Sequence, residues 1–185
     1  MRYNVIYADP PWTYDDKALA GNRGACCKYD LMSLDALKTL TVPAADDCIL
    51  FLWATMPKLP DALEVIKAWG FTFKTAAFVW VKTNTKSGTP FFGMGRWTRS
   101  NAEVVLLATK GHPHRVSAGV SQILLAEPDT LESPILKPHS RKPAEIREKI
   151  VALCGDVPRL EMFARESTPG WSVFGNQVEN SIDIH

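Results

Sequence analysis

The stretch Val5-Ile6-Tyr7-Ala8-Asp9-Pro10-Pro11-Trp12 decides the fold class and locates the first candidate site. Its first four residues form a short apolar run bounded by a turn signal, which predicts a buried strand over 5–8. A carboxylate, two prolines and a tryptophan follow at once. Ligands of open α/β sheets bind beyond the carboxyl ends of strands. We therefore expect residues 9–12 to belong to a functional site if the rest of the chain supplies such a sheet.

Short apolar runs and segments of helical spacing alternate along the rest of the chain. Leu34, Leu37 and Leu40 fall on one helix face, and Ser33 precedes them as a candidate N-cap. The predicted helices are 33–40, 57–69 and 143–154, and the further predicted strands are 48–54, 71–81 (one or two strands), 103–109, 122–126, 159–163 and 171–174. This order predicts an α/β fold, a three-layer sandwich around a mostly parallel sheet.

The composition fits a globular chain of one domain. Of 185 residues, 46% are apolar and 22% charged, so we expect a single domain over 1–185. These proportions exclude disordered and collagen-like chains, and no apolar stretch is long enough for a membrane span. The net charge of +1 requires any nucleic-acid site to be local. The cysteines suit neither a disulfide framework nor a metal pair, and a signal peptide is absent, so we expect a cytoplasmic protein.

The residue types in Asp9-Pro10-Pro11-Trp12 suit the 6-amino group of adenine. This nitrogen is a poor nucleophile because its lone pair is delocalised into the ring, and acceptors that draw on its two protons activate it. The Asp9 carboxylate and the Pro10 carbonyl are such acceptors, and Pro11 fixes the direction of that carbonyl. Trp12 offers a ring on which a purine can stack. The alternative interpretation is a proline turn with Trp12 in the core.

Further motifs stand in order along nearly the whole chain. They are Lys28-Tyr29, Met32-Ser33, Phe51-Leu52-Trp53, VWVKTN at 79–84, KGHP at 110–113, SRKP at 140–143, LEMFAR at 160–165 and GNQ at 175–177. With DPPW at 9–12, this set resembles the family of S-adenosylmethionine-dependent adenine 6-amino methyltransferases that includes the catalytic subunit of the eukaryotic mRNA adenosine methyltransferase. The resemblance implies methyl transfer from S-adenosylmethionine to the 6-amino group of adenine in nucleic acid.

The resemblance also implies a fold and a cofactor site. The fold is the Rossmann-like methyltransferase in permuted order, with the catalytic motif N-terminal and the cofactor strand C-terminal. The implied catalytic residues are Asp9, Pro10, Pro11 and Trp12, and the implied S-adenosylmethionine-binding residues are Asp9, Lys142, Glu161, Arg165, Asn176 and Gln177. Lys142 would meet the methionyl carboxylate, and the last three residues the ribose and adenine.

Ordinary structural roles stay open for several of these residues. Lys142 could be a surface lysine of a first helical turn, and Gly175-Asn176 a simple turn. Glu161 stands among apolar residues, where a carboxylate needs a ligand or a cationic partner such as Arg165.

Substrate contacts are expected in the long connections and beside them. The resemblance places Tyr29 at the substrate pocket and Glu103 near the target adenosine. Basic and aromatic residues mix in 83–101, which suits phosphate neutralisation and base stacking, with a solvated loop as the alternative. The candidate substrate-binding residues are Tyr29, Lys82, Arg96, Trp97, Arg99 and Glu103.

Other chemistries find weaker support in the sequence. His112-Pro113-His114 lacks cysteine or carboxylate ligands at metal-binding spacing, so we predict no metal. Ser140 beside His139 lacks a nucleophile-elbow motif, which argues against a hydrolase.

The expected partner is nucleic acid, DNA rather than RNA, because a compact solitary domain resembles the bacterial and phage members of the family. The alternatives are an RNA adenosine methyltransferase and a non-catalytic subunit that positions nucleic acid. Inactive relatives lose the aspartate or the tryptophan, whereas Asp9 and Trp12 are both present here. A homodimer or a partner subunit is a further option.

Overall fold

A computed structural model describes residues 1–13, 31–84, 86–93, 97–128 and 141–184. The chain consists of two compact units. Unit 1 comprises Met1–Thr75, Leu106–Pro113 and Val157–His185, and unit 2 comprises Ala76–Val105 and His114–Asp156.

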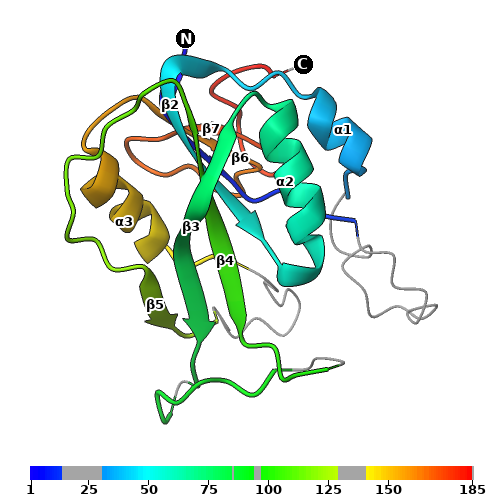
Figure 1. The fold of residues 1–185 in the computed structure, drawn as a ribbon, viewed down its shortest axis with the longest axis vertical. Helices are drawn as coiled ribbons and strands as arrows, with labels where there is room; N and C mark the ends of the chain where they lie inside the picture. The colour runs from blue at the N-terminus through cyan, green and yellow to red at the C-terminus, as the bar shows by residue number, and fades with distance from the viewer. Residues whose placement is uncertain (14–30, 85, 94–96, 129–140, 185) are drawn as a thin grey trace. The chain divides into compact units, whose positions relative to one another are not determined.

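Strands and helices occur where the sequence predicts them, and the mixed α/β class is confirmed. Among the described residues, the strands are β1 (Tyr3–Ala8), β2 (Ala44–Ala54), β3 (Thr72–Lys82), β4 (Ala102–Lys110), β5 (Ile123–Ala126), β6 (Arg159–Met162) and β7 (Ser172–Phe174). They form one seven-stranded sheet in the order β5-β3-β4-β2-β1-β6-β7 (Figure 1). The stretch 71–81, predicted as one or two strands, forms the single strand β3 from Thr72 onward.

The strands of unit 1 that surround β1 are parallel and buried. β1 pairs in parallel with β2 on one side and with β6 on the other, and β6 pairs in parallel with β7. Ile6, Leu50 and Leu160 are completely buried within these strands. Burial on both faces explains why the runs 5–8 and 48–54 are continuously apolar rather than alternating. Because parallel strands end at one edge, the residues after β1 and β6 lie close together.

Two helices of unit 1 pack against each other. The Ser33 side chain caps α1 (Leu34–Thr39), as predicted, by accepting a 3.2 Å hydrogen bond from the Ala36 amide. The indole of Trp69, at the end of α2 (Leu59–Ala68), donates a 2.8 Å hydrogen bond to the Leu37 carbonyl. Helix α2 begins later than predicted, after a 3₁₀ turn at Met56–Lys58. Pro60 explains the difference, because proline is tolerated only in the first turn of an α-helix.

Unit 2 combines a small part of the sheet with the third helix. The Lys82 amide at the end of β3 donates to the Asn101 carbonyl just before β4, so these neighbours run in opposite directions. β5 pairs in parallel with the other side of β3. Helix α3 (Glu145–Cys154) ends before Gly155, whose φ is +80°, and Lys149 on this helix donates to the Ser121 carbonyl.

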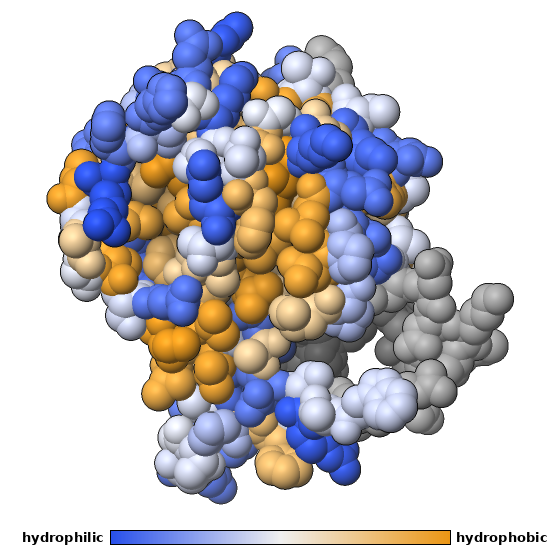
Figure 2. Space-filling view, viewed as in Figure 1, coloured by the Kyte–Doolittle hydropathy of each residue, from blue (hydrophilic) through white to orange (hydrophobic). Residues whose placement is uncertain are grey.

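Part of the sheet in unit 2 exposes apolar side chains. Ile123 and Leu125 of β5 are exposed and lie in register with Val79 and Val81 of β3. Figure 2 shows hydrophobic colour over β5 and the adjoining part of β3. None of the helices in the described ranges is long and apolar enough to cross a membrane.

Candidate active site

Asp9 stands in unit 1 directly beyond the carboxyl ends of β1 and β6. The last residue of β1, Ala8, is in register with Met162, the last residue of β6. The Asp9 amide donates a 3.5 Å hydrogen bond to the Met162 carbonyl. Asp9 therefore stands, as the sequence predicts, at the sheet edge at which parallel α/β sheets bind ligands.

The residues after Asp9 form a tight turn that is tied to the segment before α1. The Trp12 amide donates a 2.9 Å hydrogen bond to the Pro10 carbonyl, and the Met32 amide donates a 3.0 Å hydrogen bond to the Pro11 carbonyl. The Thr13 hydroxyl donates to the Met32 carbonyl at 2.8 Å. A carbonyl oxygen has two lone pairs, so the Pro10 carbonyl can accept a second hydrogen bond from a substrate amino group.

Aromatic side chains anchor this turn in the core. The Trp12 indole N–H donates a 3.2 Å hydrogen bond to the Trp53 carbonyl. The Trp53 indole N–H donates a 2.7 Å hydrogen bond to the Tyr7 hydroxyl, and the Tyr7 ring packs against the Trp171 ring with centroids 5.9 Å apart. The tetrapeptide is thereby connected to the residue that precedes β7.

Burial gives Trp12 a structural role. Only 7% of this residue is exposed, and its indole N–H is satisfied by the protein backbone. This agrees with the alternative interpretation, in which Trp12 belongs to the core. The stacking role of Trp12 stays a prediction.

Glu161 is a buried carboxylate beside the candidate catalytic turn. It is 7% exposed and lies in register between Tyr7 of β1 and Val173 of β7. In parallel strands, side chains in register point to the same face, so Glu161 shares the face of Tyr7. A carboxylate buried to this degree needs polar partners, which fits either interpretation given to it from the sequence.

The remaining cofactor candidates of unit 1 lie on two segments, one after β6 and one after β7, whose backbones are in contact. The Ala164 amide donates a 3.0 Å hydrogen bond to the Phe174 carbonyl, and a side chain at Gly175 would overlap the Ala164 carbonyl. This contact brings Arg165 near Asn176 and Gln177, and all three are exposed. Gly175 is thus required by a close backbone contact, and Asn180 accepts from its amide at 2.7 Å.

Phe163 has an unusual backbone conformation at the same edge. Its φ of +63° is the sole positive value among the described residues other than glycine. Such a conformation is costly for an aromatic residue and is typically kept at functional positions. Phe163 directly follows Met162, whose carbonyl binds Asp9.

Unit 2 brings together three residues that the sequence assigned to different roles. Glu103 of β4 contacts Lys82 of β3 through Oε1 and Nζ at 2.6 Å, and Lys142 through Oε2 and Nζ at 3.3 Å. The Lys142 side chain is only 11% exposed, so it is not the surface lysine of the alternative interpretation. Lys82 also lies over the Trp80 ring, 4.9 Å from its centroid.

The two ammonium groups keep Glu103 ionised despite its burial. Burial is the largest single effect and favours the neutral acid. The charges and hydrogen bonds of Lys142 and Lys82 together outweigh it, so the pKa of Glu103 is lower than its ordinary value. Glu103 therefore binds both ammonium groups as a carboxylate at neutral pH.

The remaining substrate candidates differ in what the structure shows of them. Trp97 and Arg99 are exposed on the connection between β3 and β4. Tyr29 and Arg96 lie outside the described residues. Within the described ranges, no three His, Cys, Asp or Glu side chains are grouped as they would be around a metal ion.

Tyr7 and Trp53 are site residues that the sequence did not single out individually. Tyr7 looks like one more apolar residue of the run 5–8, and Trp53 like one of 48–54. Their polar atoms give a signal in retrospect, because a buried tyrosine hydroxyl or indole N–H usually has a hydrogen-bond partner.

Comparisons with known proteins agree with the motifs. The MT-A70 family model matches residues 3–177. The chain is 34% identical to the Type II methyltransferase M.MunI of Mycoplasma sp., over 99% of this chain and 81% of that protein. It is 29% identical to the N6-methyladenosine RNA methyltransferase MTA1 of Pyricularia oryzae, over 95% of this chain and 47% of that protein.

A further relative carries a different description. The N(6)-adenosine-methyltransferase non-catalytic subunit METTL14 of Xenopus tropicalis is 27% identical, over 97% of this chain and 40% of that protein. The chain thus spans most of the Mycoplasma protein but less than half of these two eukaryotic relatives. The family match runs from β1 past β7 and contains the DPPW turn, and by this match the chain belongs to the MT-A70 family of methyltransferases.

Proposed function

We propose that this protein transfers a methyl group from S-adenosylmethionine to the 6-amino group of adenine in nucleic acid, most favourably DNA. The observation that carries the proposal is the position of Asp9 and the Pro10-Pro11-Trp12 turn at the carboxyl ends of β1 and β6, in a chain of the MT-A70 family. Catalysis needs acceptors placed where positive charge develops on the attacking nitrogen.

In this proposal Asp9 accepts one proton of the amino group in a hydrogen bond and the Pro10 carbonyl accepts the other. Because a carboxylate is a weak base at neutral pH, Asp9 acts by stabilising the developing charge, and the proton is lost late or to water. The backbone hydrogen bonds of this segment to Met162 and Met32 support the proposal, because they hold the main chain of the turn in place. Such preorganisation avoids a reorganisation cost during the reaction.

The residues present fit S-adenosylmethionine, which supplies the methyl group when bound. In unit 2, the Lys142 ammonium has three N–H donors and contacts Glu103 at 3.3 Å, and we assign a further donor to the methionyl carboxylate. In unit 1, Glu161 is a buried acceptor suited to ribose hydroxyls. The proposed cofactor contacts also include Asp9, Arg165, Asn176 and Gln177.

DNA is proposed over RNA because of the relatives. The bacterial relative named a Type II methyltransferase is more similar to this chain than the relative named an RNA methyltransferase, and a larger share of it is matched. A non-catalytic role, as in the name of the Xenopus relative, is less well supported because Asp9 and Trp12 are both present.

The finer points of architecture belong to the same proposal. We infer the permuted three-layer methyltransferase order, one functional domain over 1–185, and a cytoplasmic location. A homodimer or a partner subunit stays an option within it.

Product analysis tests the proposed substrate. The protein is incubated with methyl-labelled S-adenosylmethionine and with matched duplex DNA, single-stranded DNA and RNA, and the polymers are digested to nucleosides. We expect 6-methyl-deoxyadenosine from DNA. Methylated adenosine from RNA alone would show that RNA, and not DNA, is the substrate. Label in neither polymer would contradict the proposal.

A further inference from the structure

The connection between β3 and β4, residues 83–101, is here called the arm. Lys82, the last residue of β3, forms backbone hydrogen bonds to two points of the arm. The Lys82 amide donates a 2.8 Å hydrogen bond to the Asn101 carbonyl, and the Lys82 carbonyl accepts a 2.7 Å hydrogen bond from the Phe91 amide. The Lys82 side chain belongs to the cluster with Glu103 and Lys142. The base of the arm is therefore continuous with residues proposed to act at the site.

Hydrogen bonds fix the shape of the first half of the arm. The Asn84 amide donates to the Thr89 carbonyl at 2.9 Å, and the Gly88 amide donates to the Asn84 carbonyl at 2.9 Å. The Asn84 side chain adds a 3.2 Å hydrogen bond to the Thr89 hydroxyl. Thr83 and Pro90 form an antiparallel bridge. These contacts make a small hairpin at the start of the arm.

A close backbone contact fixes a second point. Gly93 is buried, and a side chain there would overlap the Ser100 carbonyl. Glycine is thus required at this position because the two backbones touch. Phe92 directly precedes Gly93 in the chain, and Arg99 directly precedes Ser100.

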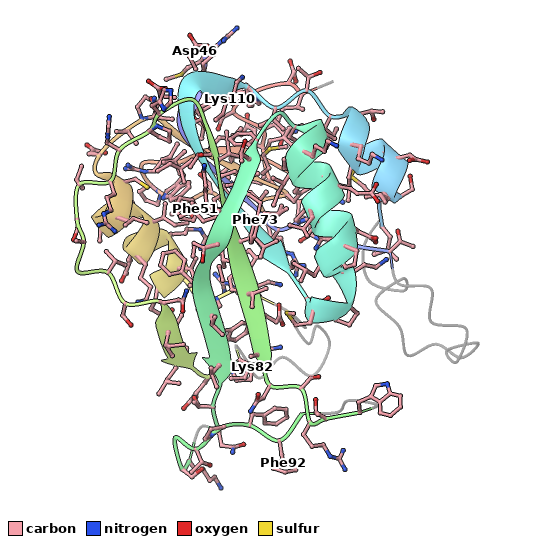
Figure 3. The ribbon with its side chains drawn as sticks, viewed as in Figure 1. Asp46, Phe51, Phe73, Lys82, Phe92 and Lys110 are labelled. Carbon is pink, nitrogen blue, oxygen red and sulfur yellow. The ribbon has the colours of Figure 1, made fainter. Side chains whose placement is uncertain are left out.

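Large aromatic side chains of the arm point into solvent. Phe92 is 78% exposed and Trp97 is 95% exposed, and Figure 3 shows Phe92 directed away from the end of β3. The other five tryptophans are each at most 8% exposed. Rings exposed to this degree are available to stack on the bases of a bound nucleic acid.

The charge of the arm indicates the kind of partner. Residues 83–101 contain Lys86, Arg96 and Arg99 and no Asp or Glu. Positive charge among exposed rings suits a strand of nucleic acid, whose phosphates are neutralised while its bases stack on the rings. A surface for a protein partner would instead be expected to be apolar, without a charge of a single sign.

We propose that Phe92 and Trp97 stack on the nucleic-acid bases beside the target adenine and occupy the gap that this adenine leaves when it is extruded from a duplex. The proposal rests on the proposed function, since it supplies a step by which a paired adenine becomes accessible to methyl transfer. Apolar wedges between base steps and extruded target bases are general devices for such access.

Tryptophan fluorescence tests the contact without requiring activity. In the free protein, Trp97 should be the tryptophan that acrylamide quenches, and Trp97→Phe should remove this component. An adenine-containing single-stranded oligonucleotide should then quench or shield the same component. No change with the oligonucleotide would overturn the proposal, and so would a free protein in which Trp97 is already shielded at higher protein concentration, because a second copy would then cover it.

The rate of methyl transfer tests whether Phe92 and Trp97 act as a wedge that fills the gap left by the target adenine. We expect Phe92→Ala and Trp97→Ala to lower the rate on a duplex with a paired target adenine by about tenfold, as loss of one base–aromatic stack implies. The rate on the same duplex with the target adenine bulged should fall much less. Val116→Ala is the matched control, since Val116 is another exposed apolar residue of unit 2.

The outcomes separate the two proposals. Unchanged rates for both arm variants on the paired duplex, or equal losses on both substrates, would overturn the wedge. A wild-type protein that methylates neither substrate would contradict the proposed function instead, and the fluorescence titration would still decide whether the arm binds nucleic acid.

Discussion

Glu103 binds Lys142 through a 3.3 Å contact between the carboxylate Oε2 and the ammonium Nζ. The same carboxylate holds Lys82 at 2.6 Å through its other oxygen. One largely shielded acid therefore joins β3, β4 and the segment before α3. Both side chains of this pair are mostly shielded from solvent.

Replacing this carboxylate should destabilise the fold in a pH-dependent way. We expect Glu103→Gln to lower the free energy of unfolding near neutral pH by about 1.5–3 kcal/mol, the usual range for a hydrogen bond to a charged group. The pKa of Glu103 is lower in the folded state than its ordinary value of 4.5. Its contribution is therefore fully present above that value and is lost as the pH falls through the folded pKa.

Urea unfolding between pH 3 and pH 7 measures this effect. The difference between the wild type and Glu103→Gln should shrink below about pH 4.5. The exposed Glu179 gives the control Glu179→Gln, which should change stability by less than about 0.5 kcal/mol. A Glu103→Gln difference that stays constant over this range would show that the ion pairs do not stabilise the fold.

Removing the Lys142 ammonium should weaken cofactor binding. We expect Lys142→Ala to lower the affinity for S-adenosylmethionine roughly tenfold to a hundredfold, because a charge-assisted hydrogen bond is lost. Calorimetric titration measures the affinity, with Lys67→Ala as the control, since Lys67 is an exposed lysine of unit 1. Normal affinity in Lys142→Ala would reject the proposed role.

The pairing between Tyr7 and Trp53 should be visible as a coupling energy. Tyr7→Phe leaves the buried Trp53 indole N–H without its 2.7 Å acceptor, so we expect a loss of about 1–3 kcal/mol in stability. Trp53→Phe removes the donor. The double variant should lose less than the sum of the two single losses. Strictly additive losses in chemical unfolding would be evidence against this hydrogen bond.

The sequence predicted the strands well because burial on both faces leaves continuous apolar runs such as 5–8 and 48–54. It also placed Asp9 correctly, since the residue after a parallel strand must lie at the carboxyl edge. The start of α2 was predicted too early because the cost of Pro60 in a helix interior was not taken into account.

Contacts between distant residues could not be predicted in the same way. The Glu103 cluster joins residues from β3, β4 and the segment before α3, and which side chains meet depends on strand register and chain path. The positive φ of Phe163 has no signature in the sequence either, because a residue type that avoids this conformation occupies it.

The rate of methyl transfer in Asp9→Ala tests the central claim most directly. Single-turnover rates on a nucleic-acid substrate that the wild type methylates are compared at saturating S-adenosylmethionine, and cofactor binding is measured on the same preparations. The account predicts a rate at least about 100-fold lower in Asp9→Ala, with cofactor binding still measurable. A variant that transfers methyl groups at the wild-type rate would contradict the assignment of Asp9 and of the site built around it.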